Sequence, residues 1–518
     1  MKTTKLFFMA ALALLMTACS SNDEGLTQKP IEQPAKAEGI TITAKLAPKS
    51  GGAATRAVAD KGDDKITATW EQNEKIAILY EVSGTKYVAT ANIDDVDAKG
   101  VATITFAVED VTPDDTPCTL VYPAILSDGT TTVYKDDLSG VKAYADMLAT
   151  QDGVLDGDLD VRVGAGTIQT TTPGLTVNTQ PAAQYSIFKF TTQDISGSAI
   201  TPTEFTVSDA AGNVITTVTL TTSDLYVALP VLTADTYWFN ATADSKPYIA
   251  KATVSTATSA GTYYQSTVKM ATLGDLMGAD GKFYANAAAI STASTTAIGV
   301  IAYLGTDNFT ENGTNVGGST FVGHGLVLCL KNAASGADAQ WSTETSALEF
   351  GEDAKVANID ALKRATNVSG YTNTKTLAEK DDADTKYKAA YAAKNYTGLT
   401  APAGTTGWFL PSAQQWVKMQ TGLGELDESS ISSNSWYDND HTAANKWETA
   451  LAKAGDGNYD SMTSTILYYW SSSEVSAGKA VSLGVDARAT GSGNGFEWNS
   501  GNKDSASGTR RVRPVLAF

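Results

Sequence analysis

Apolar and polar residues alternate strictly in one short stretch near the start of the chain. In Ile40–Leu46 an apolar side chain occupies every second position, and threonine or lysine fills the positions between. This period of two predicts a β-strand with one buried face. A Gly-, Ala- and Ser-rich segment with one arginine, Arg56, follows the strand, which is typical of an exposed loop that proteases can bind. Taken alone, the pattern is that of an ordinary first strand and loop.

The same alternation returns in short runs as far as Met270, and residues typical of turns separate the runs. We predict a first series of strands at Ile66–Trp70, Lys75–Tyr80, Tyr87–Ile93 and Val101–Val108. A second series is predicted at Tyr185–Thr191, Glu204–Val207, Val214–Leu220, Leu225–Leu229, Tyr237–Ala241 and Tyr263–Met270. Short strands at this spacing indicate two antiparallel β-sandwiches.

Beyond residue 271 helical periodicity joins the strands. Helices are predicted over Leu377–Tyr396, from a capping box at Ser412 and Gln415 onward, and along the apolar stripe Trp447, Leu451 and Ala454, which Gly455 can end. The three predictions rest on the lack of Pro and Gly, on reciprocal side-chain capping and on the helical period, respectively. Further strands are predicted at Tyr468–Glu474 and Arg510–Phe518. This mixture predicts an α+β unit.

The composition bounds the class of protein. The chain has 518 residues, of which 42% are hydrophobic and 18% are charged. This length is too great for a single core, and the composition is that of folded domains whose Thr- and Val-rich runs favour strands. The formal net charge of −19 disfavours a nucleic-acid partner, because no excess of Lys and Arg is present to replace the counterions of a phosphate backbone.

The N-terminal end carries an export signal. Lysines precede the apolar run Leu6–Met16, which is too short to span a bilayer but suits the core of a signal peptide, predicted over residues 1–18. The small residues before Cys19 resemble a bacterial lipobox, and Ser20–Glu24 resembles the acidic surface-export signal of Bacteroidales lipoproteins. The resemblance implies that a lipid such as palmitate modifies Cys19. It also implies a surface-exposed location on the outer membrane and a lipidated tether over residues 19–37.

The two remaining cysteines do not indicate a disulfide framework. Cys118 and Cys329 lie far apart in the chain, and each has apolar neighbours. We therefore predict two free, buried thiols.

The order of the N-terminal features resembles the Bacteroidales fimbrillin family, the subunits of type V pili. The features that carry the resemblance are Cys19, the strand Ile40–Leu46, Thr55–Val58, Trp70–Tyr80 and Tyr185–Phe190. The resemblance implies two transthyretin-like β-sandwich domains, over residues 38–180 and 181–271, and proteolytic maturation between Arg56 and Ala57. It further implies that strand 40–46 and loop 47–57 are removable, and that their loss opens a groove for a donor strand from another subunit.

Residues 272–518 resemble a C-type-lectin-like domain of the Fibrobacter major-paralogue type. The motifs that carry this resemblance are Gly274–Gly281, Gly323–Leu328, Trp408–Trp416, Tyr469–Glu474 and Arg511–Phe518. The resemblance implies that the first and last strands of this domain pair, which would hold the C-terminal strand inside its own domain. The complete prediction is a mainly β chain, with two β-sandwiches followed by an α+β lectin-like domain.

Catalytic and metal-binding patterns are weak. The two histidines, His324 and His441, do not stand in a recognisable catalytic setting, so we expect no enzyme activity and no cofactor. The acidic runs Asp152–Asp160 and Asp456–Asp460 depart from an EF-hand loop at its glycine and at its closing glutamate. We therefore predict no metal ion and expect the first run to be a solvated loop.

Two short segments of the C-terminal domain combine aromatic faces with carboxylates and amides, a mixture that binds sugar rings and protein surfaces. The candidate ligand-binding residues are Trp436, Tyr437, Asp438, Asp440, Glu497, Trp498 and Asn499. The alternative is that these residues are ordinary core and loop residues.

Together the two resemblances imply a non-enzymatic fimbrial tip subunit that acts as an adhesin. It would reach the outer membrane as a lipoprotein, lose its first strand by cleavage after Arg56, and join the fimbrium by accepting a donor strand from another subunit. The expected ligand lies on a host or bacterial surface, and a glycan is one candidate. Two alternatives remain open: a glycan-binding lipoprotein that stays anchored to the membrane, and a shaft or anchor subunit of the fimbrium.

Overall fold

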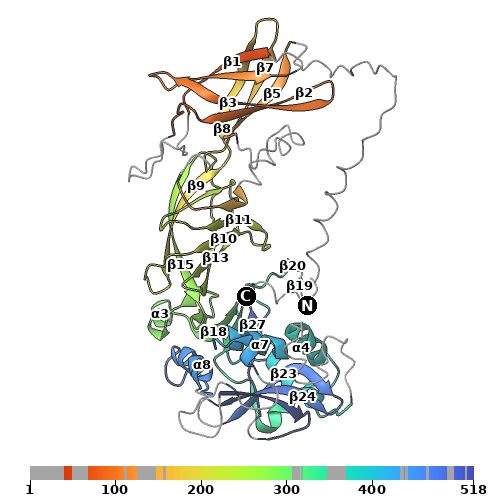
Figure 1. The fold of residues 1–518 in the computed structure, drawn as a ribbon. Coiled ribbons are helices and arrows are strands. Elements are labelled where there is room, and N and C mark those ends of the chain that lie inside the picture. The colour runs from red at the N-terminus through yellow and green to blue at the C-terminus, as the bar shows by residue number, and fades with distance from the viewer. Residues whose placement is uncertain are drawn as a thin grey trace, which may run out of the picture.

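The computed structural model describes residues 40–49, 68–109, 114–124, 148–155, 159–305, 315–316, 319–346, 369–431, 437, 441–462, 466–486, 495–507 and 510–518. This part of the chain is mainly β, as predicted. It forms an N-terminal, a middle and a C-terminal unit, which follow one another in an elongated arrangement (Figure 1).

The N-terminal unit is built on one antiparallel sheet. Its strand order is β1-β4-β3-β2-β5-β7-β8, and alternating side chains from these strands fill a single core. The strands are β1 (Ile40–Leu46), β2 (Lys75–Val82), β3 (Thr85–Val96), β4 (Ala102–Val108), β5 (Thr116–Tyr122), β7 (Arg162–Gln169) and β8 (Gly174–Ala183). The predicted bounds of the first strand are confirmed.

One predicted strand in this unit is wrong. Within Ile66–Trp70, residues 68–70 are described and do not form a strand. Trp70 is nevertheless buried, because its ring packs edge-on against Tyr122 with centroids 5.1 Å apart. Packing of its ring, rather than pairing in a ladder, accounts for the burial of Trp70.

The middle unit is built on an eight-stranded sheet with the order β12-β9-β15-β14-β13-β10-β11-β6. Its strands are β6 (Thr150–Gln151), β9 (Ser186–Asp194), β10 (Glu204–Ser208), β11 (Val214–Thr219), β12 (Leu225–Leu229), β13 (Thr236–Ala243), β14 (Lys246–Thr253) and β15 (Tyr263–Thr272). The short strand β6 pairs with β11 before the chain returns to the N-terminal unit through β7 and β8. β6 precedes residue 181 but belongs to the sheet of the middle unit, so the predicted domain boundary between residues 180 and 181 is wrong for this strand.

The C-terminal unit combines helices with two five-stranded sheets, β17-β16-β18-β21-β27 and β22-β26-β23-β24-β25, and the pair β19-β20. The first sheet contains β16 (Leu276–Gly278), β17 (Phe283–Tyr284), β18 (Ala297–Leu304), β21 (Gly325–Cys329) and β27 (Val515–Ala517). The second contains β22 (Ala334–Ser335), β23 (Leu467–Ser476), β24 (Lys479–Asp486), β25 (Gly495–Asn502) and β26 (Arg510–Val512). The pair is β19 (Asn315–Val316) with β20 (Ser319–Thr320).

The helices of this unit follow the predicted patterns in two of three places. The α-helices are α3 (Ala287–Thr292), α4 (Gly370–Ala378), α5 (Ala383–Lys386), α6 (Lys388–Lys394), α7 (Ala413–Thr421) and α8 (Thr442–Ala452). The capping box of Ser412 and Gln415 starts α7 as predicted. The apolar stripe of α8 is buried, and its Trp447 ring stacks on Trp416 at 5.9 Å.

The single helix predicted over Leu377–Tyr396 is wrong. The segment divides into the end of α4, then α5 and α6. Asp382, which lies between α4 and α5, adopts a left-handed backbone with φ of 64°. The charged residues around it offer no apolar stripe that packing could stabilise as one continuous helix.

The C-terminal strand lies inside its own unit. β27 pairs with β21, and Val515 also exchanges two backbone hydrogen bonds of 2.9 Å with Phe409. The expectation that the first and last strands pair is wrong, because β16 lies on the far side of β18 in the sheet. The C-terminal residue, Phe518, is buried.

The middle and C-terminal units share one apolar cluster, which includes the C-terminal residue Phe518; the letter C marks this end of the chain in Figure 1. Trp238 of β13 contributes to it from the middle unit, and Val327, Leu516 and Phe518 contribute from the C-terminal unit. The Trp238 ring stacks on His324 with centroids 3.9 Å apart. Since burial of this cluster needs both units, we expect their stabilities to be linked.

Replacement of Trp238 by alanine should uncouple the two units. The lost ring removes contacts on both sides of the junction, at a cost of about 3 kcal/mol. We expect the two units to unfold in one transition by calorimetry in the unchanged protein and in two transitions in Trp238→Ala. Val214→Ala is the control, because Val214 is an exposed residue of the same unit. A single transition at an unchanged temperature in Trp238→Ala would contradict a shared core.

Candidate functional site

The first strand completes the core of the N-terminal unit. β1 pairs with β4 along its whole length, from Ile40 opposite Val108 to Leu46 opposite Ala102. Its three inward side chains are exposed by no more than 1% and belong to the core: Ile42, Ala44 and Leu46. The residues between them are exposed, so β1 has the one-sided burial that its alternation predicts.

The backbone after β1 is fixed by two side chains. The indole Nε1 of Trp70 donates to the carbonyl oxygen of Ala47 at 2.9 Å, and the amide nitrogen of Ala47 donates to Oε1 of Gln180 at 2.9 Å. Gln180 lies on β8, the strand at the other end of the sheet order. The segment after β1 therefore lies between the two ends of the sheet.

Three residues beyond Leu46, the side chain of Lys49 is buried with 0% exposure. Its Nζ lies 4.1 Å from the ring centroid of Trp70 and 4.0 Å from that of Tyr122. These two rings are perpendicular, at 88°. Two carboxylates complete the surroundings: Asp160 at 3.4 Å and Glu74 at 3.5 Å from Nζ. We call the group Trp70, Glu74, Tyr122, Asp160 and Arg162 the lysine cage.

The other members of the lysine cage hold one another in place. Arg162 Nε lies 2.9 Å from both carboxylate oxygens of Asp160. The Tyr122 hydroxyl donates to Oε1 of Glu74 at 2.7 Å. With Lys49 present, two positive side chains face two negative ones, and a buried charge in this position requires such balance.

Burial sets the pKa values in the cage. Loss of solvation lowers the pKa of Lys49 to about 8, although Asp160 and Glu74 act in the opposite direction. Loss of solvation likewise raises the pKa of Asp160, against the effect of Arg162 and Lys49. A pKa of about 8 leaves the Lys49 amine mostly protonated at neutral pH, so the cage holds a cation.

The lysine cage contradicts one expectation from the sequence. The sequence did not predict the cage itself. Asp160 was expected in a solvated loop, but it is buried because it pairs with Arg162 and Lys49. Sequence reasoning missed the site because its members come from distant segments and no local spacing links them. The only local signal was a lysine in the loop directly after an alternating strand.

The predicted processing residues lie outside the described part of the chain. These are the lipidation residue Cys19 and the cleavage pair Arg56 and Ala57.

The two predicted buried thiols, Cys118 and Cys329, are confirmed as free and buried, and burial raises the pKa of each to about 12.

The two candidate ligand-binding segments lie next to each other. Tyr437 and Phe496 exchange backbone hydrogen bonds of 2.9 and 3.0 Å. Tyr437 and Trp498 are buried in the core, so neither ring offers a stacking surface. Glu497 and Asn499 are half-buried on the other face of β25, where Glu497 accepts a 2.8 Å hydrogen bond from the Tyr468 hydroxyl. Trp436, Asp438 and Asp440 are outside the described residues.

The two histidines occupy structural positions. His324 is buried against Trp238, and burial lowers its pKa to about 4. His441 Nδ1 lies 3.1 Å from the carbonyl oxygen of Asp486 and accepts from the amide of Gly495 at 3.3 Å. Neither contact pairs a histidine with a nucleophile or an acid.

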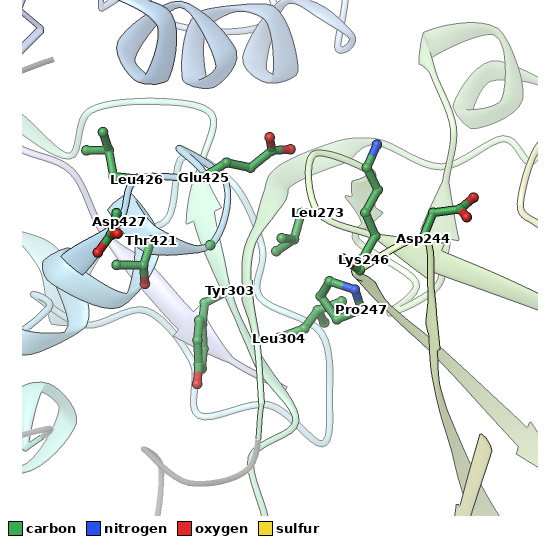
Figure 2. Close-up of a pocket in the computed structure, with 12 residues that line it drawn as sticks. Asp244, Lys246, Pro247, Leu273, Tyr303, Leu304, Thr421, Glu425, Leu426 and Asp427 are labelled. Atoms are coloured by element: carbon green, nitrogen blue, oxygen red, sulfur yellow. The ribbon is translucent and has the colours of Figure 1, made fainter. Parts of the chain in front are cut away.

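A cavity of about 580 Å³ lies between the middle and C-terminal units. Figure 2 shows Asp244, Lys246 and Pro247 on one side of it and Tyr303 and Glu425 across from them. Its volume suits a small ligand. However, Glu425 already binds Lys446 at 2.6 Å, which reduces the set of polar groups that could orient a ligand.

Two features are absent from the residues that the structure describes: a metal-ligand cluster and a membrane-spanning helix. Within them, no group of histidine, cysteine and acidic side chains is arranged to hold a metal ion. No helix in the described ranges has the length and apolar character needed to cross a membrane.

The chain matches no protein-family model, and a search of curated proteins finds no match. Among solved structures it is similar to a fimbrial protein from Bacteroides ovatus, with 15% identity over 93% of this chain and 100% of that chain and a TM-score of 0.33. It is also similar to a fimbrial assembly protein from Parabacteroides distasonis, with 10% identity over 44% of this chain and 90% of that chain and a TM-score of 0.26. TM-scores this low carry no conclusion about function. The function proposed below is based on the geometry of this chain.

The lysine cage predicts a particular dependence of stability on pH. Between about pH 8 and the ordinary lysine value of 10.5, the unfolded chain holds a proton on Lys49 that the folded chain has lost. The contribution of Lys49 to the free energy of unfolding should therefore rise with pH in this window, by up to about 3 kcal/mol. Urea unfolding at pH 7.5 and 10 should show this gain in the unchanged protein and not in Lys49→Met.

Lys45→Met is the matched control for this measurement. Lys45 lies on the exposed face of β1, so its removal changes the net charge equally without reaching the cage. It should keep the pH dependence of the unchanged protein. Parallel pH profiles for the unchanged protein and Lys49→Met would show that the cage does not shift the pKa of Lys49.

Proposed function

We propose that this chain is a fimbrial tip subunit: a non-enzymatic adhesin that is exported as a surface lipoprotein and assembled by strand replacement. Cleavage after Arg56 would free the chain from a lipid on Cys19 and separate β1 from the rest of the fold. The N-terminal unit would then accept a strand from another fimbrial subunit.

The observation that carries this proposal is the setting of β1. Among the strands that the structure describes, it lies at the end of the sheet order and pairs in a ladder with β4 alone, and it inserts three side chains into the core. Arg56 follows this strand closely in the sequence, so a single cut there would leave β1 held only by non-covalent contacts.

The energetics favour replacement of β1 over an empty groove. Loss of β1 would expose the apolar surface against which Ile42, Ala44 and Leu46 pack and leave the edge of β4 unpaired. Reburial of a large apolar side chain contributes about 1.5–3 kcal/mol, and an added strand restores the backbone ladder. An incoming strand with the same alternation would therefore bind favourably.

The packing of β27 supports a subunit that accepts a strand without giving up β27. β27 is bound between β21 and Phe409, and Phe518 is buried at the shared cluster. Donating β27 would disrupt both the C-terminal unit and its junction with the middle unit. This supports a position at the tip, with the C-terminal unit directed outward to a surface ligand such as a glycan.

The N-terminus of the assembled protein tests the proposal. N-terminal sequencing of the mature surface protein should give a start at Ala57. The variant Arg56→Ala should retain the precursor length and stay out of the fimbrium, because β1 would keep its place.

Lys61→Ala is the control, since it removes a basic residue from the same stretch of sequence and should leave processing unchanged. A mature surface protein that begins with an acylated Cys19 would contradict the proposal and would favour a permanently anchored lipoprotein.

A further inference from the structure

The lysine cage is left with an unbalanced charge when β1 is absent. Of the two positive side chains that face Glu74 and Asp160, one is Lys49, which belongs to the removable segment, and the other is Arg162. After loss of β1 the buried group would hold one excess negative charge. Both carboxylates are buried in the intact chain, so an incoming strand that buries them again without a cation leaves this imbalance uncompensated.

The shape of the cage favours an ammonium group. The rings of Trp70 and Tyr122 meet at 88° and both lie about 4 Å from Nζ. A compact ammonium touches both ring faces and both carboxylates at once, whereas a planar guanidinium stacks on one face at a time. Arg162 Nε already lies within hydrogen-bond distance of both oxygens of Asp160, so a second guanidinium could not take that place.

The remaining contacts to the segment after β1 do not select a sequence. Trp70 and Gln180 bind the backbone of Ala47, which every residue type offers in nearly the same form. The sites of Ile42, Ala44 and Leu46 accept apolar side chains in general. The cage is therefore the contact through which this groove can distinguish one alternating apolar strand from another.

We infer that the strand accepted by this groove carries a lysine three residues beyond its last core-facing apolar side chain, in the position that Lys49 occupies. This inference rests on the proposed function, since it names the partner of the same groove. The partner is a strand of another protein chain with apolar residues at three alternate positions and the lysine at the stated distance. A neutral or acidic residue there leaves the buried carboxylates uncompensated and weakens binding.

Displacement of the resident strand tests the inference directly. The full chain is given a recognition sequence for a specific protease between Ser50 and Ala57 and is cut there, so that β1 is held without a covalent link. Synthetic peptides of residues 39–50 then compete with the resident segment, and its release is followed by a fluorophore on its N-terminal end. The peptides are the unchanged sequence, Lys49→Met, Lys45→Met and a scrambled sequence.

We expect the Lys49→Met peptide to reach half-displacement only at a concentration at least about tenfold above that of the unchanged sequence, because methionine leaves Arg162 as the counter-charge to both carboxylates. The lowered pKa of Lys49 reflects the solvation that the ammonium itself loses, so the matched peptides measure which of the two costs is larger, and tighter binding of the methionine peptide overturns the inference. The Lys45→Met peptide should stay within about twofold of the unchanged sequence. Both substitutions remove one positive charge, so the comparison isolates the cage from the net charge. The same comparison is made in a chain with Asp160→Asn, whose fold is checked by circular dichroism. There the ratio of half-displacing concentrations between the Lys49→Met peptide and the unchanged peptide should decrease.

The outcomes separate the inference from the proposed function. Equal displacement by the unchanged and Lys49→Met peptides overturns the lysine requirement and leaves strand replacement intact. If no peptide displaces the resident segment better than the scrambled sequence does, strand replacement itself is overturned, and the inference falls with it.

Discussion

The N-terminal unit depends on a core that its first strand, β1, completes. β1 supplies three buried side chains and a full ladder to β4, so the rest of the sheet can reach its lowest free energy only when some strand fills this place. In the intact chain β1 fills it. The constraint does not require that the strand belong to the same chain, which is the physical argument behind the proposed strand replacement.

Charge adds selectivity to this apolar constraint. A groove that only buries alternating apolar residues accepts many sequences, because hydrophobic burial is non-directional. The lysine cage instead places two carboxylates and one guanidinium out of contact with water, and this set is balanced only by one further cation. Burial thereby turns an ordinary lysine into a residue whose position along the strand matters.

The opposite end of the molecule is constrained in a different way. β27 lies within a sheet of the C-terminal unit, and the cluster around Trp238 joins this unit to the middle one. The C-terminal strand therefore contributes to two packed regions at once. β1 lies at the end of its sheet order, whereas β27 is packed within two regions, and this difference is why the proposal replaces β1 and leaves β27 in place.

The sequence by itself determined elements whose pattern is local: the strand Ile40–Leu46, the capping box at Ser412 and the buried stripe of α8. Hydrophobic periodicity and capping act between near neighbours, so they can be read along the chain. Tertiary structure alone decided that Leu377–Tyr396 breaks into separate helices, that β6 joins the middle unit and that Asp160 is buried beside Lys49. These features depend on contacts between distant segments, and burial of a charge in particular is set by the partners that the fold brings to it.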